Sequence, residues 1–158
     1  MIEEVEFHTG VDEPLGFACR LLRKASRQGA RVVVTAAPGD LARLDTLLWT
    51  FEERAFVPHV RVAPGSLPAH AARTPIWLLD GGSVALPDGA PSVLLNLGAA
   101  PPEAPAVMAH LTRVIEVLGT EAEALAAGRQ RWRAYQARGL SIKHHPAGGA
   151  AAGGNTGG

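Results

Sequence analysis

Short apolar runs and longer stretches with helical periodicity alternate along the first fifty residues. Residues 5–8 and 31–35 have the length and composition of strands, and the second run is so continuously β-branched that we expect it to be buried on both faces. The stretch after each run carries apolar residues at helical spacing: Leu15, Cys19, Leu22 and Ala25 in the first, and Leu41, Leu44, Leu48 and Phe51 in the second. The order strand, helix, strand, helix predicts a parallel sheet covered by helices.

Three further strands are predicted in the second half of the chain, at residues 76–79, 93–97 and 113–118. A long helix should follow the last of them. Thr120 with Glu123 three residues later is typical of a capping box, and Gly139 offers a stop after Arg138.

The ends of the first helix are also marked in the sequence. Asp12 is a plausible N-cap, Pro14 suits a first helical turn, and Gly29 offers a stop. We therefore predict an α/β fold of three layers, with a mostly parallel sheet, helices on both faces and a nucleotide-binding-like topology. Residues 1–142 should form this domain. Residues 143–158 are rich in Gly and Ala and should be a disordered tail, because they offer little apolar surface to offset the entropy of ordering.

Composition narrows the class of protein. The chain has 158 residues, 47% of them hydrophobic and 19% charged, which is typical of one globular domain. Its formal net charge of zero argues against direct nucleic-acid binding. Cys19 is the single cysteine, the first four residues lack the basic start of a signal peptide, and no apolar run is long enough to cross a bilayer. We expect a cytoplasmic protein that does not contact a membrane.

The motifs of catalysis and cofactor binding are absent from the sequence. There is no G-x-x-x-x-G-K-[ST] and no G-x-G-x-x-G, so the turn after the first strand lacks the glycines of a phosphate loop. No G-x-S-x-G occurs, and Cys19 lies on an apolar helical stripe, as buried structural thiols do. The six histidines form no H-x-x-x-H pair, and His144 and His145 fall in the predicted tail. We expect no catalytic residue, no cofactor and no metal.

The segment 129–140 is both basic and aromatic in a chain without net charge. Drawn as a helix, it places Leu125, Trp132 and Tyr135 on one stripe, with Arg129 and Arg133 on one side and Arg131 and Arg138 on the other. Such a face suits a ligand that combines an apolar anchor with carboxylates, because Arg pairs a carboxylate through two parallel hydrogen bonds. The alternative is a docked helix with a solvated basic face, in which Trp132 fills the core.

Two strings, in this order and separation, give the chain a family resemblance. They are R-L-D-x-x-L-W…F-V-P-H, at residues 43–49 and 56–59, and W-R-A-Y-x-x-x-G-L, at residues 132–140. Over residues 1–142 the chain resembles the chi subunit of the bacterial DNA polymerase III holoenzyme. Trp132 stands where a tyrosine is familiar in that family, and Leu125 is not basic.

The resemblance implies a non-catalytic adaptor in DNA replication. It implies that the C-terminal tail of single-stranded-DNA-binding protein binds at Leu125, Arg129, Trp132, Arg133 and Tyr135. It also implies that psi, the subunit that joins chi to the clamp loader, binds near Trp49, Phe56, Val57 and Pro58. For the psi interface a core role remains open. Two other functions also stay open from the sequence: a small nucleotide-dependent enzyme on the same topology, and direct nucleic-acid binding.

Overall fold

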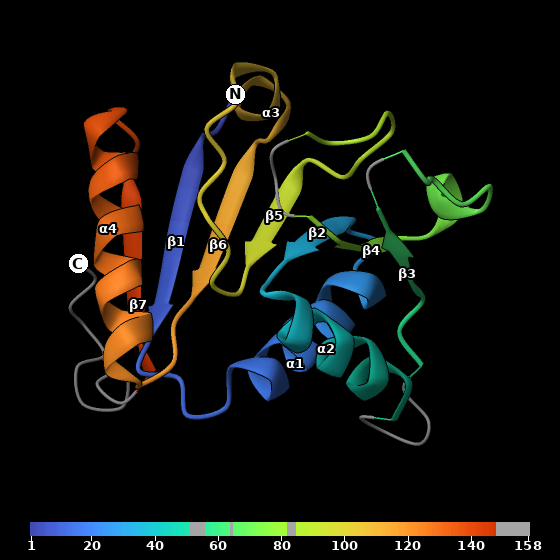
Figure 1. The fold of residues 1–158 in the computed structure, drawn as a ribbon, viewed down its shortest axis with the longest axis horizontal. Helices are drawn as coiled ribbons and strands as arrows, with labels where there is room; N and C mark the ends of the chain where they lie inside the picture. The colour runs from blue at the N-terminus through green and yellow to red at the C-terminus, as the bar shows by residue number, and fades with distance from the viewer. Residues whose placement is uncertain (51–55, 64, 82–84, 148–158) are drawn as a thin grey trace.

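A computed structural model describes residues 1–50, 56–63, 65–81 and 85–147. In these ranges seven strands form one sheet, in which neighbouring strands all pair in parallel and the order is β3-β4-β2-β5-β6-β1-β7 (Figure 1). The strands are β1 Glu4–Thr9, β2 Val32–Thr35, β3 His59–Val62, β4 Ile76–Leu79, β5 Val93–Asn96, β6 Arg113–Val117 and β7 Ile142–Pro146. The predicted α/β class and parallel sheet are confirmed.

Helices cover both faces of the sheet, so the central strands are buried on both sides and consist mostly of apolar residues. All four residues of β2 and of β4 are buried, as their unbroken apolar runs predict. On one face, α1 (Pro14–Arg27) and α2 (Pro38–Thr50) pack with buried Cys19, Leu22, Leu41 and Leu44. Phe51, the last residue of the predicted α2 stripe, lies outside the described residues.

The opposite face is covered by α3 (Pro105–His110) and α4 (Ala122–Ala137). Figure 1 shows α4 at one end of the sheet, beside β1 and β7. Gly128 allows α4 to pack closely against Leu118, because a Cβ at position 128 would lie 2.3 Å from Cδ1 of Leu118. The helix ends as predicted: Arg138 is its C-cap, and Gly139 follows at φ 76°.

One predicted boundary is wrong, and three elements were not predicted: β3, α3 and the 3₁₀ helix Ala71–Arg73. The four residues of β3, His-Val-Arg-Val, are half polar and lack the apolar run that marks β2 and β4. The helix α3 has only six residues, too few for helical periodicity to reveal it. The predicted tail boundary is wrong for residues 143–146, because they belong to β7 and pair in parallel with β1. Backbone hydrogen bonds to a neighbouring strand order this polar segment, although it buries little apolar surface. The remainder of the predicted tail, residues 148–158, lies outside the described residues.

The predicted N-caps of α1 and α4 are also wrong. The N-cap of α1 is Glu13 and not Asp12, because Pro14 occupies the first helical position. The N-cap of α4 is Glu121, whose side chain makes no capping hydrogen bond, so Thr120 lies too early for a capping box. Within the described ranges, the helices are too short or too polar to cross a membrane.

Candidate functional site

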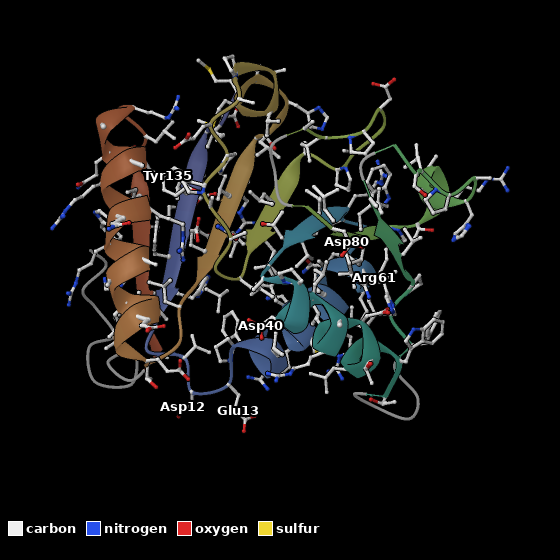
Figure 2. The ribbon with its side chains drawn as sticks, in the orientation of Figure 1. Asp12, Glu13, Asp40, Arg61, Asp80 and Tyr135 are labelled. Carbon is white, nitrogen blue, oxygen red and sulfur yellow. The ribbon has the colours of Figure 1, made fainter. Side chains whose placement is uncertain are left out.

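The predicted basic-aromatic stripe is only partly on the surface of α4. Arg129 and Arg133 are exposed, while Leu125 and Trp132 are half-buried. Tyr135 is 1% exposed and belongs to the core, on the sheet-facing side of the helix (Figure 2). The exposed part of the predicted site therefore consists of two arginines beside the accessible edge of an indole.

Arg131 is buried, contrary to its predicted place on the exposed flank of the stripe. Its Nε donates to Oε1 of Glu116 at 2.8 Å, and both side chains are almost fully enclosed. The buried residues of α4 are Gly128, Arg131 and Tyr135, at spacings of three and four residues. The prediction set Arg131 beside a binding stripe of Leu125, Trp132 and Tyr135, because arginine is usually a surface residue. The signal it missed was Glu116, an acidic residue inside the apolar run of β6.

The Glu116 carboxylate is the centre of a buried polar network. Tyr135 donates its hydroxyl to Oε2 at 2.6 Å, and Asn96 donates from Nδ2 to the same oxygen at 3.1 Å. Thr35 extends the network by donating to Oδ1 of Asn96 at 3.0 Å. Burial raises the pKa of Glu116, and the charge of Arg131 and the three donors oppose that rise.

This network occupies the carboxyl ends of β2, β5 and β6. Open α/β sheets commonly bind nucleotides outside the carboxyl ends of their strands. Here the polar side chains at that edge form hydrogen bonds with one another. Burial and the adjacent Glu116 carboxylate raise the pKa of Tyr135, so its hydroxyl stays protonated and donates to Glu116. The arrangement holds α4 on the sheet.

Trp132 lies at the junction of α4, β1 and β7. Its ring packs against Phe7 with a centroid distance of 4.8 Å and meets His144 edge-on at 5.6 Å. Because His144 is in β7, the strand that was predicted to be tail forms part of the wall beside Trp132. The indole is therefore held in place on one side and accessible on the other.

The predicted psi interface separates into exposed and buried residues. Trp49 and Phe56 are 59% and 58% exposed, and their ring centroids are 5.0 Å apart. Val57 is 2% exposed and belongs to the core, while Pro58 is half-buried. The sequence could not separate these residues, because an apolar residue is equally suited to a core or to an interface.

The His59 ring packs against both members of this aromatic pair. Its Nε2 contacts Oδ1 of Asp45 at 2.9 Å and its Nδ1 contacts the carbonyl of Val57 at 2.7 Å, so both ring nitrogens have partners. The His59 ring lies 5.1 Å from that of Trp49. An imidazole with both nitrogens engaged positions its neighbours and is poorly placed to act as a catalytic base.

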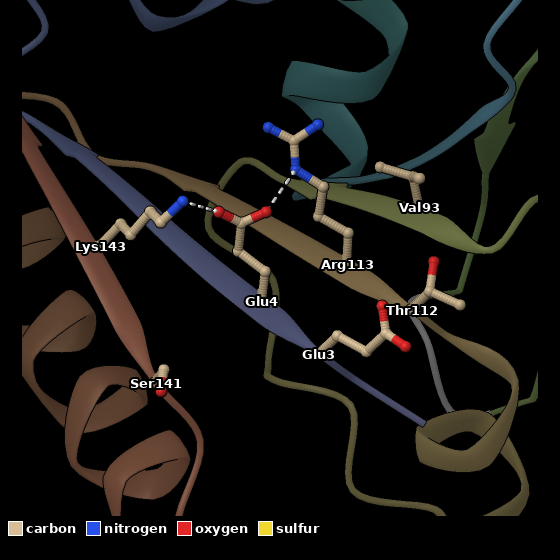
Figure 3. Close-up of a pocket in the computed structure, with 7 residues that line it drawn as sticks. All are labelled: Glu3, Glu4, Val93, Thr112, Arg113, Ser141 and Lys143. Atoms are coloured by element: carbon tan, nitrogen blue, oxygen red, sulfur yellow. Dashed lines mark ion pairs between the residues drawn. The ribbon is translucent and has the colours of Figure 1, made fainter.

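A charged surface depression lies on the opposite side of β1 from α4 (Figure 3). Its lining residues are Glu3, Glu4, Val93, Thr112, Arg113, Ser141 and Lys143. Glu4 forms ion pairs with Lys143 at 2.6 Å and with Arg113 at 3.7 Å, as the dashed lines show. The side-chain hydrogen bond from Lys143 lowers the pKa of Glu4, so this carboxylate is ionised and paired at neutral pH.

Comparison with known proteins places the chain in a family. The sequence model of the family described as DNA polymerase III chi subunit, HolC, matches residues 2–143. The chain is 33% identical over 132 residues to DNA polymerase III subunit chi of Pseudomonas aeruginosa, an alignment that covers 83% of this chain and 84% of the relative. The protein belongs to the DNA polymerase III chi subunit family.

Proposed function

We propose that the protein is a non-catalytic adaptor of DNA replication. In this proposal one surface binds the psi subunit of the DNA polymerase III clamp loader, and a second binds the C-terminal tail of single-stranded-DNA-binding protein. Membership of the chi subunit family supports a place in DNA polymerase III. The observation that carries the adaptor role is the separation of the two candidate surfaces.

The two surfaces belong to opposite edges of the sheet. Phe56 is three residues before β3, the strand at one edge, and its ring contacts those of Trp49 and His59. Trp132 contacts Phe7 and His144, which belong to β1 and β7 at the other edge. The width of a seven-stranded sheet lies between them (Figure 1). A partner at either edge would leave the other edge free.

The tail site is proposed at Arg129, Arg133 and the accessible edge of Trp132, with Leu125 beside them. The exposed guanidinium groups would pair with the acidic residues and the terminal carboxylate of the tail. The indole would receive its apolar terminal residue. Tyr135 contributes indirectly, because its bond to Glu116 holds α4 in position.

A labelled peptide with an acidic, aromatic-ended tail tests this site by fluorescence anisotropy. We expect micromolar affinity, as for a short segment that becomes ordered when it binds. Arg129→Ala should weaken binding about three- to tenfold and flatten its salt dependence, because the lost contact is an exposed ionic one. Arg27→Ala on α1 is the matched control, since it removes the same charge from another exposed helix position.

Trp132→Ala separates the apolar part of the site from the ionic part. It should weaken binding while leaving the salt dependence nearly unchanged, and circular dichroism should check that the fold survives the loss of its contact with Phe7. If Arg129→Ala and Trp132→Ala both bind the peptide as tightly as the parent, α4 has only a solvated basic face and the tail proposal is wrong.

The psi interface is proposed at the pair Trp49 and Phe56. Two large aromatic side chains that are more than half exposed and packed on each other are unusual on a free surface and suit a protein interface. Phe56→Asp should abolish co-purification with psi while leaving the free protein folded, because the side chain contributes little to the core.

Leu67 offers a matched control for this interface. It is 46% exposed, so Leu67→Asp also introduces a charge at an exposed apolar position. Leu67 follows the C-terminal end of β3, whereas Phe56 precedes the start of that strand. We expect Leu67→Asp to bind psi like the parent. Equal loss of psi binding in both variants, or unchanged binding in Phe56→Asp, would reject this location.

A further inference from the structure

Three potential metal ligands lie together on one face of the strands β1 and β7. Glu6 and His8 are two residues apart in β1, so their side chains share a face of the sheet. His145 lies directly opposite His8 in the parallel register of β1 with β7. Residues separated by more than 130 positions in the sequence therefore meet at this edge.

The distances between these side chains approach those of a metal site. Nε2 of His8 is 3.7 Å from Oε2 of Glu6, and one ligand atom from each of the three residues lies within 4.8 Å of the others. Two ligands of a tetrahedral Zn²⁺ are roughly 3.4 Å apart, given metal–ligand bonds of about 2.0–2.1 Å. Small rotations of exposed His145 would complete the convergence, since its ring already stacks on that of His8 at 4.8 Å.

We propose that Glu6, His8 and His145 bind one divalent transition-metal ion of the Zn²⁺ type. Two imidazoles and one carboxylate suit Zn²⁺, Ni²⁺ or Co²⁺ better than Mg²⁺ or Ca²⁺, which prefer sites made of oxygen atoms. Three protein ligands leave a coordination position for water.

The surroundings hold the two inner ligands in place. Arg113 forms an ion pair with Glu6, with Nη2 2.8 Å from Oε2. This pair orients the carboxylate and competes with a metal for its charge. The ring of Phe17 lies 5.1 Å from that of His8. His145 is the exposed ligand, so a bound ion would tie the last strand of the sheet to β1.

His144 provides the decisive control, because it is adjacent to His145 but lies on the other face of β7. Its Nε2 is 2.6 Å from Oγ1 of Thr9, and its ring meets that of Trp132. A flexible pair of neighbouring histidines would bind metal through either ring. The proposed site requires His145 and leaves His144 uninvolved.

The experiment is a calorimetric titration of ZnCl₂ into the untagged full-length chain after treatment with a chelator. We expect one ion per chain and an increase in melting temperature with Zn²⁺, because the ion binds the folded state. His145→Ala and His8→Ala should each weaken binding about tenfold or more, while His144→Ala should change it less than about twofold.

Co²⁺ gives an independent measurement of the ligand set. The parent and His144→Ala should develop the visible absorption of a low-symmetry complex, and His145→Ala should not. His145 is exposed, so its variant should remain folded even if His8→Ala does not. The proposal is overturned if the parent binds no Zn²⁺, or if His144→Ala and His145→Ala weaken binding equally.

Discussion

Arg129 and Arg131 lie two residues apart on α4 and have opposite environments. Arg129 is exposed, whereas the guanidinium of Arg131 is enclosed and donates to the Glu116 carboxylate at 2.8 Å. Removing a cation from a buried pair leaves an uncompensated charge in the interior, which is far more costly than losing an exposed charge.

We predict that Arg131→Ala lowers the free energy of unfolding by about 3–5 kcal/mol. Arg129→Ala should change it by less than about 0.5 kcal/mol, because its side chain is in solvent. Urea denaturation monitored by circular dichroism compares the two variants. A cost below about 1 kcal/mol for Arg131→Ala would mean that water replaces the lost guanidinium and that the network does not hold α4.

Cys19 is the single thiol and is enclosed between α1 and the sheet. Burial raises the pKa of the Cys19 thiol to about 11, so little thiolate forms near neutral pH. We predict that Ellman's reagent at pH 8 modifies the native chain slowly and the urea-unfolded chain at once. Rapid modification of the native protein would show that α1 opens readily.

At the scale of elements, β7 is the part of the chain that most changes the sequence-based picture. It pairs with β1, and Ile142 packs against the core cluster that contains Phe7 and Tyr135. His144 adds its contact with Trp132. The strand therefore forms one edge of the sheet and contacts the indole of the proposed tail site.

A chain that ends at Ser141 should be less stable than one that ends at Ala147. We expect a loss of about 2 kcal/mol, from the missing strand hydrogen bonds and the exposed core beneath Ile142, which corresponds to a fall of about 4–8 °C in Tm. Differential scanning calorimetry of the two truncations gives the comparison. Equal melting temperatures would mean that β7 contributes nothing to stability.

For the whole molecule, the separation of the two proposed interfaces has a measurable consequence. Because they lie at opposite edges of a seven-stranded sheet, psi and the acidic tail peptide should bind at the same time. The affinity for the peptide should change by less than about twofold when psi is bound, since no shared residue couples the sites. Surface plasmon resonance on a captured complex of this chain with psi measures this, and competition between the ligands would contradict it.

Several features could be predicted from the sequence alone, because they depend on residues near one another in the chain. Apolar runs and helical spacing predicted α1, α2, α4 and the strands β1, β2, β4, β5 and β6. Two short strings of residues were enough to suggest the chi subunit family, which the comparisons confirm.

Other features were decided only by the tertiary structure, because they depend on partners distant in the sequence. Arg131 is buried because Glu116 of a neighbouring strand neutralises it, and nothing within α4 itself indicates that. Residues 143–146 are ordered because β1 offers its open edge, which also brings His145 beside His8. The local sequence pattern indicates which secondary structure a segment forms. Its burial, strand pairing and exposure depend on the segments that pack against it.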